Sequence, residues 1–199
     1  MSEAAVQLDD FDNQNLRDLG DRLLETTRAE YVDEGVLLIM NPPGIEHRRI
    51  VRGISDSVKR AYYTGQITVN WAVDENYQWD LPDDKSRRFY VPDIVFIHPD
   101  AKTAEEERAA IVMVVEVTSP SSPDTVLNDR TTKPIQYAKA GVPLYLLVDQ
   151  ELGQWTLHGL HQGWQRYPIV AAGPYGEEIP LPPPLGFTLP TADWPRWRT

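Results

Sequence analysis

The chain of 199 residues contains no cysteine, and this absence excludes disulfide bonds and zinc sites built from thiolates. No apolar run approaches the roughly 20 residues needed to span a bilayer, and the first ten residues lack the basic and apolar segments of a secretory signal. A glycine-rich phosphate loop and a serine nucleophile elbow are also missing. We therefore expect a cytoplasmic protein without a membrane span or an organic cofactor.

Basic residues are scarce, because 19 Lys and Arg stand against 30 Asp and Glu and give a formal net charge of −11. This balance argues against binding nucleic acid through a broad basic surface. It does not exclude a nuclease, since bound cations invert the local sign at an acidic site. The basic residues are also unevenly spread, with a concentration between His47 and Arg60. The charge distribution alone therefore neither excludes nor establishes a nucleic-acid substrate.

The apolar periodicity predicts one domain over residues 13–199, after a flexible N-terminus over residues 1–12. Helices are predicted over residues 13–29, between Gly44 and Gly65, and over residues 125–140, with a surface helix or loop over 102–110. The second helix should bury one stripe, formed by Ile50, Val51, Ile54, Val58 and Ala61. Strands are predicted over residues 36–40, 67–73, 91–97, 111–118 and 142–148. Pro134 either kinks its helix or delays the start to about Thr132. A hairpin over 155–158 and 164–170 precedes a proline-rich tail, about 173–199, that we expect to wrap the surface.

Two carboxylates occur within the apolar runs that we predict to be strands. Asp93 lies near the start of the run 91–97, and Glu116 follows five apolar residues in the run 111–118. A carboxylate is costly to bury unless it is paired or binds a cation. Because neighbouring strands lie ~4.8 Å apart, the two can share one Mg²⁺ together with a backbone carbonyl, for which Val117 is the candidate. The alternatives are a turn residue for Asp93 and a satisfied structural carboxylate for Glu116.

Lys133 places a positive charge on the helix predicted after these strands. It lies four residues after Asp129 and four before Tyr137, so the three side chains share one helix face. The ammonium group can stabilise phosphate charge or hold an attacking water, while Asp129 orients the amine and Tyr137 packs beside it. The alternative is a solvated lysine in an ordinary ion pair. With the two carboxylates, the pattern predicts metal-dependent phosphodiester cleavage.

Longer motifs around these residues resemble the Uma-type (DUF820-like) family of "putative restriction endonucleases", which belongs to the PD-(D/E)XK nuclease superfamily. The matching segments are Pro92-Asp93, Glu116-Val117-Thr118-Ser119-Pro120-Ser121-Ser122, the spaced Asp129, Lys133 and Tyr137, and Ala140-Gly141-Val142-Pro143-Leu144-Tyr145-Leu146-Leu147-Val148-Asp149. The resemblance runs from about residue 31 to residue 149. Its specific part is the block 116–149.

This resemblance implies a restriction-endonuclease-like core. That core is an α/β (α+β) fold with a mixed central β-sheet flanked by helices, followed here by the C-terminal β-hairpin. It also implies Mg²⁺ or Mn²⁺ held by Asp93 and Glu116. The superfamily usually has its lysine two residues after the glutamate, where this chain has Thr118. Similar proteins move the lysine onto the following helix, and Lys133 matches that position.

The resemblance further implies supporting residues on the helix before the paired strands. An acidic residue is common there, and Glu46 is the nearest match, with Glu34 a weaker candidate. His47 matches a histidine that such sequences carry at this helix start. A catalytic role for His47 and a simple hydrogen bond to backbone are both open.

Three functions follow as hypotheses. The first is a metal-dependent endonuclease that hydrolyses DNA, with Asp93 and Glu116 on the metal and Lys133 at the phosphate. The second is a catalytically silent nuclease-fold module that binds nucleic acid or protein. The third is a nuclease acting on RNA or branched DNA. A homodimer is compatible with each, because cleavage of two strands benefits from two sites.

Overall fold

The computed structural model describes residues 5–7, 28–33, 36–40, 42–75, 77–80, 89–120, 123–161, 163–164 and 166–197. Most of the helix predicted over residues 13–29 lies outside this part of the chain. Its last two residues are not helical, because they belong to strand β2 (Arg28–Asp33). Within the segment predicted to be loose, Ala5–Gln7 form strand β1, which pairs with strand β3 (Val36–Met40).

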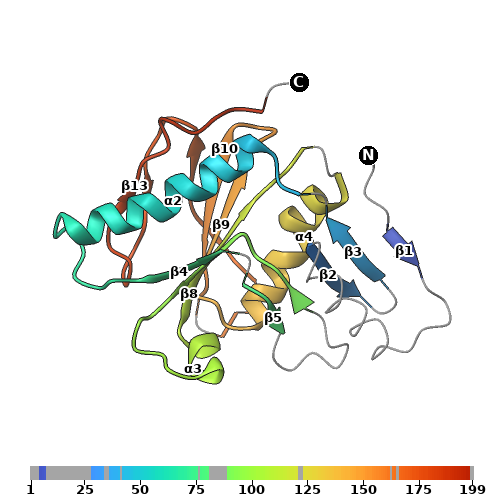
Figure 1. The fold of residues 1–199 in the computed structure, drawn as a ribbon, viewed down its shortest axis with the longest axis horizontal. Helices are drawn as coiled ribbons and strands as arrows, with labels where there is room; N and C mark the ends of the chain where they lie inside the picture. Colours follow the sequence, from blue (N-terminus) through green and yellow to red (C-terminus); the bar gives the residue numbers. More distant parts are fainter. Residues whose placement is uncertain are drawn as a thin grey trace.

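A six-stranded mixed sheet forms the centre of the molecule (Figure 1). Its strand order is β11 (Ile169–Pro174), β10 (Gln154–Gly159), β9 (Leu144–Asp149), β8 (Ile111–Val117), β7 (Ile94–Ile97) and β4 (Ala72–Glu75). Among these described strands only β8 and β9 pair in parallel, because helix α4 (Pro123–Lys139) supplies the long crossover that parallel strands require. The predicted mixed sheet is confirmed, and so is the hairpin, β10–β11, with its second strand shifted towards the C-terminus.

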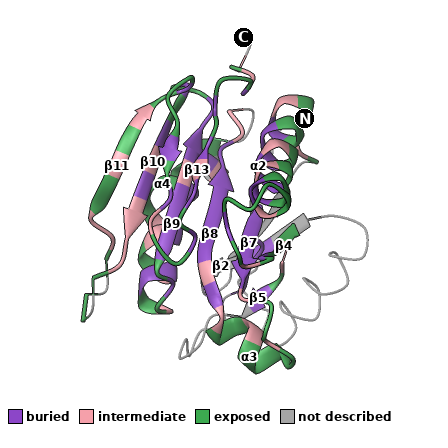
Figure 2. Ribbon diagram, turned by 90° about the vertical axis from the view of Figure 1, so that its left-hand side faces the viewer, coloured by how far each residue is buried: buried purple, intermediate pink, exposed green. Residues whose placement is uncertain are grey.

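Two long helices cover opposite faces of this sheet. Helix α2 (Ile45–Tyr63) buries the predicted stripe of Ile50, Val51, Ile54, Val58 and Ala61. These residues pack with alternate strand residues such as Phe96 and Val115. On the other face, Tyr137 of α4 packs with the intervening residues Val95 and Val114. The apolar runs 91–97 and 111–118 therefore become strands that are buried on both faces, as Figure 2 shows for β7 and β8.

Helix α4 continues through Pro134, so its start is not delayed to Thr132. The helix begins at Pro123 and ends before Gly141, whose φ of 81° suits a glycine at the helix C-terminus. Helix α3 (Ala104–Ala109) is the short surface helix expected between β7 and β8, and Thr103 caps its N-terminus by accepting the Glu106 N–H.

A second sheet has the strand order β1, β3, β2, β6 (Phe89–Tyr90) and β5 (Trp79–Asp80). Strands β5 and β6 lie between the strands predicted over 67–73 and 91–97, in a segment for which the sequence predicted no strand. The strand expected over 67–73 is shorter and later, at Ala72–Glu75. Through the pairing of β2 with β6, this sheet brings residue 30 next to the start of β7.

The C-terminal tail is part of the core. Strands β12 (Ile179–Pro180) and β13 (Thr188–Leu189) pair, and the tail buries Tyr175, Ile179, Leu181, Leu185, Phe187, Leu189 and Trp194 in the cluster that holds α2. The expectation that the tail wraps the surface is therefore wrong: its apolar residues between the prolines complete the face of the sheet beside α2. Among the described helices, none combines the length and the apolar character needed to cross a membrane.

Because the tail is buried in the core, we expect it to contribute measurably to the stability of the fold. Leu189 is fully buried, so Leu189→Ala should lower the free energy of unfolding by about 2–5 kcal/mol through the reduced burial and the cavity left behind. Ile169→Ala is the matched control, because that side chain is 65% exposed and should change stability by less than about 0.5 kcal/mol. Urea unfolding followed by circular dichroism measures both. Equal small effects would place Leu189 outside the core.

Candidate active site

Lys133 is buried and held by three carboxylates. Its side chain is 1% exposed, and its Nζ lies 2.9 Å from Glu30 Oε1, 2.9 Å from Asp129 Oδ1 and 3.1 Å from Glu116 Oε1. The carboxylates come from strand β2, helix α4 and strand β8, so three elements meet at one ammonium group. The alternative of a solvated surface lysine is therefore wrong. We call Glu30, Glu116, Asp129 and Lys133 the buried charge cluster.

Glu30 is the member of the cluster that the sequence analysis missed. Its side chain is fully buried, and its Oε1 also accepts a hydrogen bond from the Val91 N–H at 2.9 Å. Its partners lie far away along the chain, at Val91 and Lys133. No local pattern marks this glutamate, since only the pairing of β2 with β6 carries it to the site. Glu34, the weaker candidate for an extra acidic residue, lies outside the described residues.

Asp93 lies beside the cluster, just before β7. Its Oδ2 accepts the Val117 N–H at 2.7 Å and lies 3.0 Å from His47 Nε2. Strands β7 and β8 pair antiparallel with Ile94 opposite Val115, so the next step along the ladder brings Asp93 opposite Glu116. The two predicted carboxylates are thus on adjacent strands at matching heights. His47 is buried near the start of α2 and contacts this carboxylate.

Glu116 and Tyr137 form a direct hydrogen bond. The Tyr137 hydroxyl donates to Glu116 Oε1 at 2.8 Å, and the Tyr137 ring stacks on Trp79 with centroids 5.7 Å apart. This hydroxyl and the Lys133 ammonium approach the same oxygen, from positions four residues apart on α4. Tyr137 therefore orients the carboxylate as well as packing beside the lysine.

Two further positions named by the family resemblance, Thr118 and Glu46, take no part in this network within the described residues. Thr118 is buried, and its hydroxyl oxygen accepts the Gln150 N–H at 3.0 Å, which is a structural role at the end of β8. Glu46 is half-buried in the first turn of α2, where a carboxylate complements the helix dipole. Within the described residues, Glu30 occupies the acidic place beside Lys133 for which Glu46 was the nearest sequence match.

Burial and mutual repulsion make the cluster attract positive charge. Burial raises the pKa of Glu116 well above its usual value; Lys133 opposes this shift, while Asp129, Asp93 and Glu30 add to it. Burial likewise raises the pKa of Asp129 to about 6, again against the effect of Lys133. Burial also raises the pKa of Tyr137 well above its usual value, so its hydroxyl stays a donor. The site favours uptake of a proton or a cation.

The donor set fits a divalent cation that prefers oxygen. Glu30, Asp93, Glu116 and Asp129 are buried with one lysine and one histidine, and Glu30 Oε2 has no hydrogen-bond partner among the described residues. Carboxylate oxygens are the ligands that Mg²⁺ and Mn²⁺ take. Within the described ranges, no three acidic or histidine side chains are arranged as a ready-made metal cage.

Comparisons with known proteins agree on a nuclease family. A family model described as "Putative restriction endonuclease", Uma2, matches residues 16–192. Among solved structures, the chain is similar to a "putative nuclease belonging to DUF820" from Anabaena variabilis, with a TM-score of 0.57 and 16% identity. That match covers 81% of this chain and 88% of the other chain, and it shows a shared fold. The comparison with curated proteins found no match.

Removal of the buried Lys133 ammonium should destabilise the fold, because the carboxylates around it would then repel one another. Lys133→Met keeps much of the side-chain volume but leaves three carboxylates without their cation. We therefore expect the free energy of unfolding to fall by about 3–5 kcal/mol at neutral pH. Much of the loss should disappear near pH 5, where the carboxyl groups can take up protons. Urea unfolding in EDTA at both pH values measures this, with exposed Lys139→Met as the control. A loss independent of pH would contradict the electrostatic explanation.

The raised pKa of Asp129 predicts a second pH effect. The folded protein holds a proton at Asp129 up to about pH 6, whereas the ordinary value is 3.8. The folded state therefore binds more protons in this window, and the free energy of unfolding falls as pH rises from 4 to 6. The slope attributable to Asp129 is at most about 1.4 kcal/mol per pH unit. Asp129→Asn should remove it, as measured by unfolding curves of both proteins in EDTA; identical slopes would refute the assignment.

Proposed function

This chain belongs to the Uma2 family of "putative restriction endonucleases", and from that membership we propose that it hydrolyses phosphodiester bonds of DNA with Mg²⁺ or Mn²⁺. The observation that supports the proposal most is the juxtaposition of Asp93 and Glu116 on adjacent strands, with the buried Lys133 ammonium 3.1 Å from Glu116. A structural ion pair needs one carboxylate for one ammonium. This site gathers several, which suits a centre that handles additional positive charge.

Each residue of the site has a proposed task. Asp93, Glu116 and the Val117 carbonyl would hold the metal ion, which would lower the pKa of a water molecule and offset charge on the phosphate. Lys133 stabilises negative charge on the phosphate through its ammonium group. Tyr137 orients Glu116 through its hydrogen bond of 2.8 Å.

Three other side chains hold these groups in place. Glu30 and Asp129 each lie 2.9 Å from Lys133 Nζ and fix the position of the amine. His47 lies 3.0 Å from Asp93 Oδ2, and together with the Val117 N–H it holds that oxygen in place. Such supporting contacts keep catalytic groups in a productive geometry before substrate arrives.

Substitution of the metal-binding carboxylates tests the proposal. Asp93→Asn and Glu116→Gln should each lower Mn²⁺-dependent cleavage of plasmid and oligonucleotide DNA by at least about 100-fold, because each removes an anionic ligand. Asp100→Asn is the control, since that side chain is 89% exposed and follows the end of β7 that is opposite to Asp93. Cleavage that survives in both active-site variants would remove these residues from the mechanism. RNA and branched DNA in the same panel identify the preferred substrate.

Metal binding can be measured apart from catalysis. Calorimetric titration of Mn²⁺ should show binding to the wild type and none to a folded Asp93→Ala/Glu116→Ala variant, with circular dichroism as the folding check. If neither protein binds Mn²⁺, with or without an uncleavable oligonucleotide present, a catalytically silent binding module becomes the better description. In that case the Lys133 ammonium by itself compensates the cluster.

A further inference from the structure

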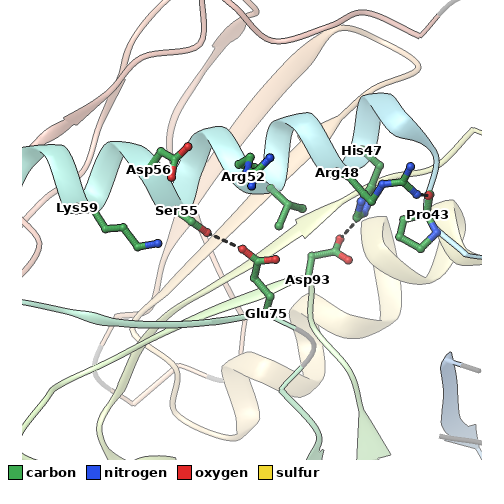
Figure 3. Close-up of a pocket in the computed structure, with 10 residues that line it drawn as sticks. Pro43, His47, Arg48, Arg52, Ser55, Asp56, Lys59, Glu75 and Asp93 are labelled. Carbon is green, nitrogen blue, oxygen red and sulfur yellow. Dashed lines mark hydrogen bonds and ion pairs between the residues drawn. The ribbon is translucent and has the colours of Figure 1, made fainter. Parts of the chain in front are cut away.

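A groove lies beside the candidate active site, along helix α2. It has a volume of about 500 Å³, and its lining includes Arg48, Arg52 and Lys59 of α2, Glu75 of β4, and the site residues His47 and Asp93. Figure 3 shows these side chains along one stretch of the helix, with Asp93 reaching His47 near one end and Lys59 at the other. We call this feature the α2 groove.

The α2 groove is the place where an acidic chain concentrates positive charge. Helix α2 carries five basic residues and two acidic ones, in a protein with a formal net charge of −11. Arg48, Arg52 and Lys59 are spaced by four and seven residues, so they lie on one helix face. At a rise of ~1.5 Å per residue they are separated by about 6 Å and about 10 Å along the axis. A row of cations along a groove suits a row of anions.

The acidic side chains that line the groove are largely engaged. Asp93 Oδ2 contacts the Val117 N–H and His47, and Glu75 Oε1 accepts a hydrogen bond from the Ser55 hydroxyl at 2.9 Å. Asp56, on the same helix, is the third acidic residue of the lining. By contrast, the side chains of Arg52 and Lys59 are exposed and have no ion pair within the described part of the chain. These two cations remain available to a ligand.

We propose that the α2 groove binds the backbone of a single, unpaired DNA strand. Arg48, Arg52 and Lys59 hold phosphates adjacent to the one that reaches Asp93. This proposal rests on the proposed function, and it adds the route by which substrate approaches.

One feature of the groove favours a single strand, and another favours contacts to the backbone of that strand. Asp93 is only 5% exposed, so a phosphate must enter the groove to reach it, and one extended strand is slimmer than a duplex. Among the described residues that line the groove, none is a phenylalanine, tyrosine or tryptophan on which a base can stack. The contacts are therefore to phosphates, which position a strand without reading its sequence.

Paired charge removals on one helix test the proposal. The groove variant is Arg52→Gln/Lys59→Gln, and the control is Arg49→Gln/Arg60→Gln, which removes the same charge from α2 residues outside the groove lining. Fluorescence anisotropy in EDTA measures binding of a labelled single-stranded oligonucleotide and its duplex over a range of salt concentrations. Circular dichroism checks that each variant is folded.

The wild type should bind the single strand more tightly than the duplex. The groove variant should bind the single strand at least about tenfold more weakly, and the slope of log affinity against log salt should fall by about 0.7 for each phosphate that the variant no longer neutralises. The control should stay close to the wild type. Equal weakening in both variants, no weakening in either, or preference for the duplex would each overturn the proposal.

The binding assay also separates this proposal from the proposed function. If the wild type cleaves DNA and the groove variant binds and cleaves like the control, only the α2 groove assignment fails. If the wild type shows groove-dependent binding of a single strand but neither binds Mn²⁺ nor cleaves, the groove assignment stands and the catalytic proposal fails.

Discussion

The burial of one ammonium group among carboxylates is the constraint on which the site depends. Breaking a buried ion pair by removal of one partner is strongly destabilising, because the other charge then lies unpaired away from water. Lys133 must therefore keep its carboxylates close, and they must keep Lys133. The same burial raises the pKa of Glu116 and of Asp129. The carboxylates that hold the amine therefore also attract protons and cations. The charges that stabilise the fold here therefore include the residues that we propose for catalysis.

The chain topology brings this set together. The parallel pair β8–β9 needs a crossover, and helix α4 in that crossover carries Asp129, Lys133 and Tyr137 on one face. The antiparallel pairing of β7 with β8 places Asp93 opposite Glu116. The second sheet adds Glu30 from the other side of the site. Each of these helices and strands forms for local reasons. Their charged side chains meet because the β8–α4–β9 crossover, the β7–β8 pairing and the second sheet all bring residues to one site.

The proposed catalytic residues and the proposed binding groove lie with different helices, on opposite faces of the central sheet. The buried charge cluster lies with α4, whereas the exposed cations of the α2 groove lie along α2. Asp93 lies beside the cluster and also lines the groove, where it contacts His47. Under these proposals, the arrangement explains how a chain with a net charge of −11 would bind a polyanion. Negative charge elsewhere repels nucleic acid, while a short basic row along one helix offers a local path to the site.

Sequence alone determined which residues could carry the chemistry. Continuous apolar runs predicted β7 and β8, and helical spacing predicted α2 and α4. Glu116 was conspicuous because five apolar residues precede it. Local patterns of this kind report burial, so they reveal a charge placed where burial is expected. Tertiary structure decided what they could not report. Glu30 reached Lys133 through long-range strand pairing, and the proline-rich tail entered the core because its apolar residues complete the sheet face beside α2. Neither outcome has a local signature, since each depends on contacts between segments far apart in the chain.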